Sequence, residues 1–301
     1  MAITFEQLLE NAKFFEWIPM VLLIFAIVYL ILGLWYMLSK MFSRPDWEAR
    51  AKVEMTRMIV SGLMIIGIAG FATVIAMATY ALAEDANPFD VSREFIGGLA
   101  MNDLPTQVSK LWESSREARI ESSINKPMPS CTAGACFTEH AGHVYIANNL
   151  EMIATVVIPF SASLVVQLLV LDVIRQFFLS LLLPAGFILK IAPVTRDSGA
   201  FLISLALAFY FVFPMVYVAG SLMHKEVGTK VKGELERMVS SSKLGDAYDF
   251  DNGRSLKAVA ALAYLGPFAM TIPLLAVILS IAAARSLFPV FSKDFVDEVN
   301  M

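Results

Sequence analysis

Charged side chains are scarce in this chain of 301 residues. Asp, Glu, Lys and Arg together make up 17% of it, whereas soluble proteins contain about 25%. Apolar residues make up 57%, and the mean hydropathy is +0.67. A soluble domain of this length could not hide so much apolar side chain, because its surface has to stay solvated. The composition therefore favours a membrane protein and excludes a disordered chain.

Residue types that carry chemistry are also few. The sequence has two cysteines and three histidines, and it has neither a phosphate-binding glycine loop nor an H-E-x-x-H motif. No arrangement of Ser, His and Asp stands out as a catalytic set. The 23 basic residues are outnumbered by 27 acidic ones, which argues against a soluble, basic nucleic-acid-binding protein. We therefore expect a protein that is not an enzyme and that holds neither a cofactor nor a metal.

Long apolar segments dominate what is present. Six of them stand out, at 17–38, 58–83, 152–171, 177–193, 199–223 and 258–284. A helix needs about 20 residues to cross the hydrocarbon core, and five of the segments have that length. The shorter segment 177–193 contains Lys190, and it either spans the membrane or re-enters it. The prediction is an all-α, polytopic integral membrane helix bundle with about six transmembrane helices.

Loop charges suggest an orientation. The loop after the first segment has five basic and three acidic residues, whereas the loop 84–151 has five basic and ten acidic residues. The positive-inside rule then places the first loop in the cytoplasm and both the N-terminus and the loop 84–151 outside the cell. If 177–193 spans, the inside total is 13 Lys and Arg against 10 outside; if it is re-entrant, these totals invert.

The chain divides into five parts on this basis. They are an external N-terminus with the first two transmembrane helices (1–83), an external loop (84–151), the central transmembrane helices (152–224), a cytoplasmic amphipathic loop (225–257), and the last transmembrane helix with the tail (258–301). The expected localisation is the cell membrane, with the chain crossing it several times.

The external loop contains a predicted helix and both cysteines. From Thr106 to Ile120 the sequence places Val108, Leu111, Trp112, Ser115 and Ala118 on one helical face. Further on comes Cys131-Thr-Ala-Gly-Ala-Cys136, and an oxidising exterior favours a disulfide between these two residues. His140 and His143 follow and make zinc the alternative, although zinc fingers separate the Cys pair from the His pair by a longer segment.

Polar residues near the third apolar segment have two interpretations. Asp172 and Arg175 are three residues apart, so they would face each other on a continuous helix, and Gln167 lies on the same face as Arg175. Ionisable groups at bilayer depth are costly and often mark a pathway. The residues therefore either fix a helix turn at the membrane border or line the cytoplasmic mouth of a channel. Lys190 and Arg196 are expected to extend to lipid headgroups.

The cytoplasmic loop predicts an amphipathic helix from Lys225 to Lys243. Its apolar residues recur at helical spacing: Val227, Val231, Leu235 and Met238. Such a helix can lie on the anionic inner leaflet or dock a soluble partner, and it can equally be a solvated helix with no partner.

One segment resembles a known family. Residues 181–204, LLLPAGFILKIAPVTRDSGAFLIS, resemble the pattern L-P-x-G-x-x-[KR]-x-x-P-x-T-R-x-x-G that precedes a span in polytopic archaeal membrane proteins. The predicted layout, two spans followed by a large external loop, is similar to that of the TrbL-like membrane subunit of type IV secretion and conjugation channels. Archaeal relatives include the membrane subunit of the Ced DNA-import system.

The resemblance implies a membrane channel built from several copies of the chain. It implies a separate cytoplasmic ATPase and single-stranded DNA as cargo. The net acidic loop 84–151 is a poor surface for DNA phosphates. The alternatives are a small-solute transporter or ion channel, and an envelope scaffold that conducts nothing.

Overall fold

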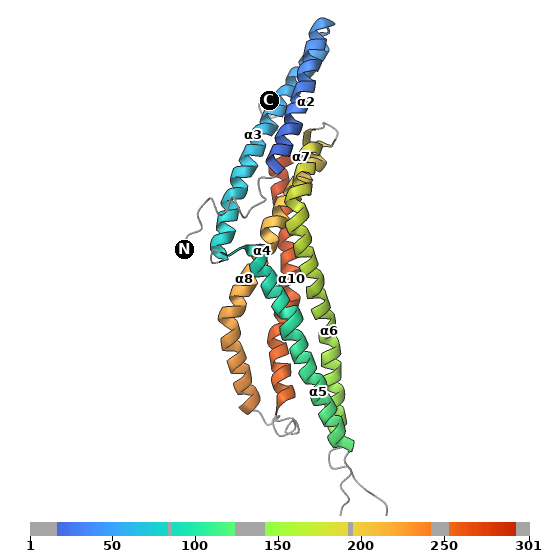
Figure 1. Ribbon diagram of the computed structural model, residues 1–301, viewed down its shortest axis with the longest axis vertical. Helices are drawn as coiled ribbons and strands as arrows, with labels where there is room; N and C mark the ends of the chain where they lie inside the picture. The colour runs from blue at the N-terminus through green and yellow to red at the C-terminus, as the bar shows by residue number, and fades with distance from the viewer. Residues whose placement is uncertain (1–16, 84–85, 124–141, 192–194, 242–252, 293–301) are drawn as a thin grey trace, which may run out of the picture. The chain divides into compact units, whose positions relative to one another are not determined.

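The computed structural model describes residues 17–83, 86–123, 142–191, 195–241 and 253–292 of the chain (Figure 1). Within these ranges the protein is helical and contains no strand. Cys131, Cys136 and His140 lie outside the described residues, so the disulfide and the alternative zinc site stay predictions.

Ten helical elements make up the described chain. In order they are α2 (Trp17–Met41), α3 (Pro45–Leu82), α4 (Pro88–Gly97), the π-helix η2 (Gly98–Asp103), α5 (Leu104–Ser123), α6 (His143–Val173), the π-helix η3 (Ile174–Leu182), α7 (Leu183–Ile191), α8 (Arg196–Ser241) and α10 (Arg254–Ser292).

Five helices in the described ranges are long and apolar enough to cross a membrane. They are Pro19–Met41, Pro45–Leu82, His143–Lys190, Arg196–Gly228 and Arg254–Ser292. The all-helical class and the long apolar helices are confirmed at this level. The structure differs from the sequence expectation at 152–171 and 177–193, because residues 152–191 belong to one helical run. The π-helix η3 joins them without a turn, and the helical run continues through Pro184, the second residue of α7.

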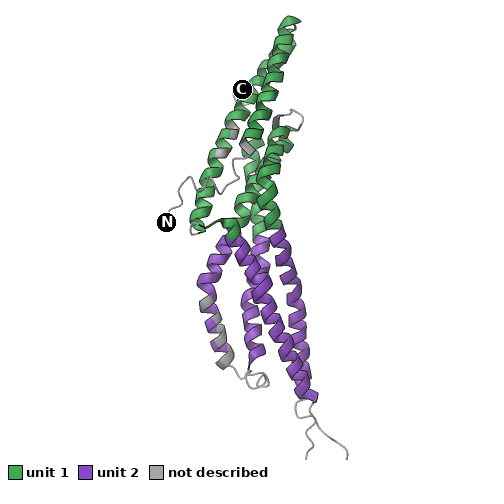
Figure 2. Cartoon of the chain, in the orientation of Figure 1, with its two compact units in different colours: residues 1–90, 170–216, 276–301 green, residues 91–169, 217–275 purple. Residues whose placement is uncertain are grey.

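The chain forms two compact units (Figure 2). Unit 1 contains residues 1–90, 170–216 and 276–301, and unit 2 contains residues 91–169 and 217–275. The helices α4, α6, α8 and α10 contribute residues to both units.

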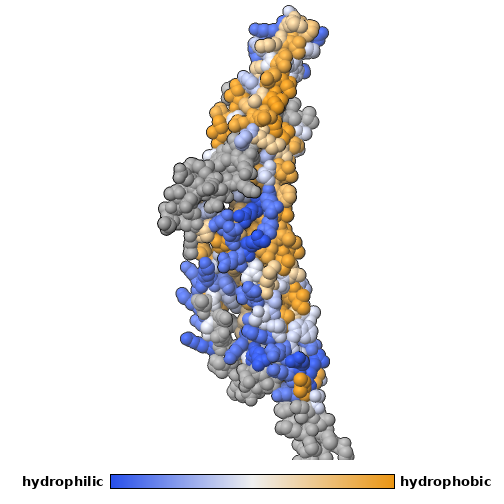
Figure 3. All heavy atoms as spheres, in the orientation of Figure 1, coloured by the Kyte–Doolittle hydropathy of each residue, from blue (hydrophilic) through white to orange (hydrophobic). Residues whose placement is uncertain are grey.

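Unit 1 has a core of closely packed apolar side chains. Its members include large side chains of η3, α7, α8 and α10: Leu179, Leu183, Phe187, Ile203, Leu207, Phe211 and Phe291. By contrast, large apolar side chains along α2 and α3 are exposed, among them Leu30 at 63%, Met37 at 72% and Ile66 at 69%. Figure 3 shows apolar side chains gathered over this part of the chain. Such a surface requires lipid or another protein to cover it.

Unit 2 is organised around an antiparallel pair of helices, α5 and α6. The hydroxyl of Ser161 donates to the carbonyl of Ala100 in η2, at 2.8 Å. Further along, Ser115 donates to Glu151, Arg119 donates to Asn148, and Nδ1 of His143 lies 3.1 Å from the Glu121 carboxylate. Along these contacts the residue numbers rise on α5 while those of their partners fall on α6, so the two helices run antiparallel. The predicted helix over 106–120 is confirmed, with Leu111, Ser115 and Ala118 buried on its inner face.

Candidate functional site

The first candidate site is an ion pair within unit 1. Nη1 of Arg175 lies 2.7 Å from Oδ1 of Asp90, and the two side chains are 40% and 58% exposed. Arg175 stands in the first turn of η3. π-helices are frequent at functional sites because their wider turn shifts the direction of the side chains that follow. Asp90 stands in the first turn of α4, where a carboxylate is also favoured by the helix dipole.

An aromatic ring lies beside this ion pair. The guanidinium carbon of Arg175 lies 5.9 Å from the centroid of the Phe89 ring, and that ring lies 4.9 Å from the ring of Tyr210. Phe89 is buried, and the side chain of Asn87 accepts a hydrogen bond from its backbone N–H at 3.0 Å. The arginine is therefore held on one side by a carboxylate and on the other by the face of an aromatic ring.

The predicted pore residues lie in different surroundings. Asp172 is half-buried on α6, three residues before Arg175. Asp90, which lies 85 positions away in sequence, is a partner that the helical spacing did not reveal. Gln167 belongs to unit 2, where its side-chain oxygen accepts a hydrogen bond from the hydroxyl of Tyr217. The described contacts of Arg175 and Gln167 therefore involve different partners, Asp90 and Tyr217.

The segment that resembles the channel family forms a tight helical hairpin. A side chain at Gly199 would place its Cβ 2.3 Å from the backbone nitrogen of Lys190, and a Cβ at Gly186 would lie 2.8 Å from Cγ1 of Ile203. The hydroxyl of Thr195 donates to the carbonyl of Leu189 at 2.8 Å. The backbones of α7 and α8 approach each other at these two positions, so only a residue without a side chain fits at each of them.

The basic residues of this hairpin are not at a lipid surface in the described chain. Lys190 is 5% exposed, and its Nζ donates to the carbonyl of Phe291 at 2.7 Å. The side chain of Arg196 is 15% exposed, and its Nη2 lies 3.4 Å from Oε2 of Glu54. The expectation that both extend to headgroups is wrong for this conformation, since a buried cation needs an acceptor and each has one nearby.

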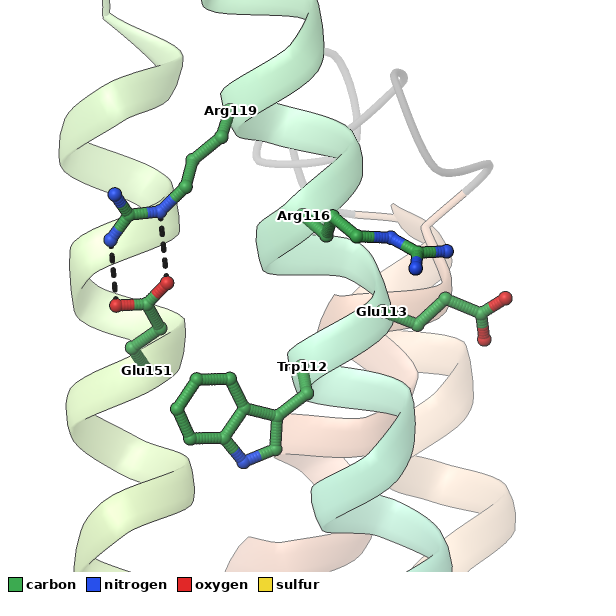
Figure 4. Close-up of a pocket in the computed structure, with 5 residues that line it drawn as sticks. All are labelled: Trp112, Glu113, Arg116, Arg119 and Glu151. Carbon is green, nitrogen blue, oxygen red and sulfur yellow. Dashed lines mark hydrogen bonds and ion pairs between the residues drawn. The ribbon is translucent and has the colours of Figure 1, made fainter.

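The second candidate site is a pocket in unit 2 of about 570 Å³ (Figure 4). It is lined by Trp112, Glu113, Arg116, Arg119 and Glu151. In Figure 4 the side chains of Trp112 and Arg119 turn toward α6, whereas those of Glu113 and Arg116 turn away from it. Arg119 binds Glu151 through two hydrogen bonds, with Nε at 2.9 Å and Nη2 at 2.7 Å from the two carboxylate oxygens.

Two polar segments meet beside this pocket. Nη1 of Arg254, at the start of α10, lies 3.3 Å from Oε2 of Glu113 and 3.4 Å from Oε1 of Glu117. Arg254 belongs to the predicted cytoplasmic loop, and the two glutamates belong to the predicted external loop. Side chains in contact cannot lie on opposite sides of a bilayer, so this contact favours an arrangement with both segments on one side.

The predicted helix over 225–243 is the end of α8, which runs to Ser241. Val227 and Met238 are exposed and Val231 is half-buried, whereas the side chain of Leu235 lies outside the described set. Gly228 on the same helix packs closely against α10. A Cβ at this position would lie 2.2 Å from the hydroxyl of Tyr264. That hydroxyl is 2.8 Å from Nδ1 of His224.

Metal ligands do not gather anywhere in the part of the chain that the structure describes, where no three His, Cys, Asp or Glu side chains are close enough to hold an ion. Comparison of the chain with models of protein families, with curated proteins and with solved structures gives no significant match.

Sequence reasoning missed Asp90 and Glu151 as site residues. Each is a single carboxylate beside an apolar segment, and its partner is far away in sequence. Trp112 was placed on the correct helix, but the spacing assigned it to the packed face, and it is 44% exposed.

Proposed function

We propose that this chain is a membrane-embedded wall subunit of an aqueous channel, assembled from several copies, that passes single-stranded DNA with the help of a separate cytoplasmic ATPase. The observation that carries the channel part is the contrast between the exposed faces of α5 and α6 in unit 2.

The two helices lie side by side over a defined stretch. The contact of Ala100 with Ser161 marks one end of it, and the contact of Ser115 with Glu151 marks the other. Over this stretch α6 exposes Met152 at 65%, Val156 at 53% and Ile158 at 49%. The neighbouring stretch of η2 and α5 exposes mostly polar side chains, Asn102, Thr106, Ser109 and Glu113, with Met101 and Trp112 as its large exposed apolar ones. One face therefore suits lipid and the other suits water.

This pairing is typical of the wall of a water-filled passage. A polar helix face inside a bilayer is stable only when it faces water or another polar surface. The exposed pair of Asp90 and Arg175 in unit 1 has the same requirement, because a charge pair facing hydrocarbon would be strongly disfavoured. Several copies of the chain, arranged with the α5 face of unit 2 inward, would satisfy this requirement for unit 2.

A chain that crosses the membrane five times is consistent with the contact of Arg254 with Glu113 and Glu117, because the start of α10 and this part of α5 then lie on the same side of the membrane. The termini then lie on opposite sides, and the Glu113–Glu117 part of α5 lies on the same side as the segment 225–257, while α5 before Glu113 runs along α6 inside the bilayer. The segment 225–257 contains seven Lys and Arg residues, so the positive-inside rule places that side in the cytoplasm. In that orientation Cys131 and Cys136 are in a reducing compartment, and the thiols are expected to be free.

The DNA part of the proposal is supported by the resemblance over 181–204. Every glycine and hydroxyl that the pattern prescribes has a packing role in the α7–α8 hairpin, at Gly186, Thr195 and Gly199. The pattern therefore supports a shared scaffold, and its residues are not cargo contacts in this structure.

Two measurements test the proposal. Single cysteines at positions 113 and 254, in a variant without Cys131 and Cys136, should react with a membrane-impermeant maleimide from the same side of sealed vesicles. Labelling from opposite sides would contradict the five-span arrangement.

Particle images of the purified protein in lipid nanodiscs should show a ring of copies around a lumen, and a strictly monomeric particle would contradict the channel.

A small-solute transporter is the second candidate. It requires a solvated binding site enclosed by one chain near mid-membrane. The pocket of Figure 4 is open at the surface and lined mostly by charges that are already paired. This favours the multi-copy channel over the transporter.

A further inference from the structure

We propose that the turn between α2 and α3 binds an anionic phospholipid of the bilayer, with the lipid phosphate on Lys40 and Arg44 and the acyl chains along α2. Both residues belong to unit 1. The inference rests on the proposed function only for the insertion of the chain in a membrane, and it is independent of the passage and of its cargo.

The helices α2 and α3 form an antiparallel hairpin whose register is set by Phe25 and Gly62 (Figure 1). A Cβ at Gly62 would lie 3.0 Å from Cζ of Phe25, so the two positions are level with each other. Both helices rise by the same distance per residue. Residues 30–41 of α2 therefore lie beside residues 46–57 of α3, in the part of the hairpin next to the turn.

The two sides of this part of the hairpin differ in polarity. On α2 the exposed side chains are large and apolar, among them Leu30, Leu34, Met37 and Met41. All the charged residues of α3 lie on the other side of the hairpin: Asp46, Glu48, Arg50, Lys52, Glu54 and Arg57. In Figure 3 hydrophilic side chains border an apolar strip at this end of the chain. A hairpin with one apolar and one charged side suits the boundary between lipid and water.

Aromatic rings hold the two cations at the turn. Nζ of Lys40 lies 5.5 Å from the centroid of the Tyr36 ring, and the guanidinium carbon of Arg44 lies 5.1 Å from that of the Trp47 ring. Both basic side chains are exposed. Aromatic and basic residues together are typical of the membrane–water interface. A guanidinium that lies over a ring keeps its in-plane N–H donors for the oxygens of a phosphate.

Carboxylates near the turn bind other cations. Glu48 lies 2.8 Å from Nζ of Lys52, and Glu54 is held by two arginines. In the part of the chain that the structure describes, neither Lys40 nor Arg44 lies within ion-pair distance of a carboxylate. The turn and the charged side of α3 together contain five basic residues and three acidic ones. The charge at the turn is therefore complementary to an anionic headgroup.

A second copy of the chain is the other candidate for covering the apolar strip. The strip is continuous with the rest of the candidate span in α2, where Leu23 and Ile27 are exposed, and it ends at Lys40 and Arg44. A phospholipid has the same order, because its acyl chains end at the phosphate. The match to both the strip and the cations favours the lipid.

The test uses the fluorescence of Trp47 in the full chain, reconstituted in vesicles of equal parts phosphatidylglycerol and phosphatidylcholine. Three background substitutions leave Trp47 as the single tryptophan: Trp17→Phe, Trp35→Phe and Trp112→Phe. One of the two lipids carries bromine on its acyl chains, which quenches a nearby indole. From the quenching we expect a relative binding constant at least about fivefold in favour of phosphatidylglycerol, the contribution of one basic side chain at an anionic surface.

The variants test the two cations one at a time. Lys40→Gln and Arg44→Gln are each expected to lower the preference for phosphatidylglycerol about fivefold. Lys52→Gln is the matched control, because it removes the same charge about 12 Å along the hairpin from Arg44, at 1.5 Å per residue. At that distance salt screens the charge, so the preference should change less than twofold.

The other outcomes overturn the inference in different ways. Equal quenching by the two brominated lipids would overturn the headgroup site and leave membrane insertion intact. Equal losses in Arg44→Gln and Lys52→Gln would assign the preference to the general charge of the hairpin. Quenching that appears only when the protein is diluted in lipid would assign the strip to a second copy of the chain. A chain that does not enter the vesicles at all would count against the proposed function as well.

Discussion

Units 1 and 2 hold their helices together by different means. In unit 1 the α7–α8 hairpin brings backbone against backbone at Gly186 and Gly199, and apolar side chains fill the rest of the core. In unit 2 the α5–α6 pair is joined by hydroxyl, carboxylate and guanidinium contacts, and the closely packed glycines Gly220 and Gly228 on α8 meet side chains. Backbone contact leaves no room for adjustment, whereas side-chain contact can relax. The two units should therefore respond differently to equivalent substitutions.

The largest effect is expected at Gly199 in unit 1. A Cβ there would lie 2.3 Å from the nitrogen and 2.7 Å from the Cα of Lys190, and neither atom can move without displacing α7. We expect Gly199→Ala to destabilise the fold by about 3 kcal/mol or more. The measurements are folded yield and the midpoint of thermal unfolding in detergent.

The matched control is Gly67→Ala on α3, where nothing lies within 4 Å of the new Cβ. That change should leave stability the same or raise it by up to about 1 kcal/mol. Similar results for the two variants would show that α7 and α8 do not approach as closely as described.

A smaller effect is expected at Gly228 in unit 2. The new Cβ would meet the hydroxyl of Tyr264 at 2.2 Å, and the ring can turn away at the loss of its contact with His224. We expect Gly228→Ala to cost about 2 kcal/mol. Gly233→Ala on the same helix, with nothing within 4 Å, is the control. A loss as large as that at Gly199 would remove the distinction between the two units.

Removal of the Asp90–Arg175 ion pair in unit 1 should reduce transport more than it reduces the stability of the fold. Arg175 and Asp90 are both well exposed, so Arg175→Ala should lower stability by less than about 1 kcal/mol. If the pair faces the passage, DNA transfer should fall about tenfold, the size of one lost charge-assisted contact. Membrane abundance and DNA transfer have to be scored separately.

The charge-swapped variant Asp90→Arg with Arg175→Asp separates two explanations. If the pair only fixes the turn at η3, the swap restores whatever Arg175→Ala loses. If the guanidinium itself contacts the cargo where it stands, the swap does not restore transfer. Full transfer by Arg175→Ala at normal abundance would leave the pair a purely structural clamp.

The smallest effect is expected at Ser161 on α6. Its hydroxyl donates to the carbonyl of Ala100 within the π-helix η2. Ser161→Ala removes that hydrogen bond and should cost about 1 kcal/mol. Ser163→Ala, at an exposed position of the same helix, is the control and should be neutral. An equal response of the two variants would mean that η2 does not depend on Ser161.

Much of the fold could be predicted because it depends on local composition. A charge-free run such as 199–223 is helical and apolar whatever surrounds it, since a backbone out of water has to satisfy its own hydrogen bonds. The face of α5 that buries Leu111 and Ala118 followed from a spacing of 3.6 residues in the same way. Where a segment ends was harder to predict: between 171 and 177 the sequence offers a charge pair and no helix breaker, and the helix continues.

The sequence by itself determined that the chain is helical, rich in long apolar segments and poor in catalytic groups, because these properties belong to residues and their nearest neighbours. Only the tertiary structure decided that Arg175 meets Asp90 and that Arg254 meets Glu113 and Glu117. Each of those pairs joins residues more than 80 positions apart. Which charges meet across such a distance depends on how whole helices pack, and no periodicity along the chain encodes that.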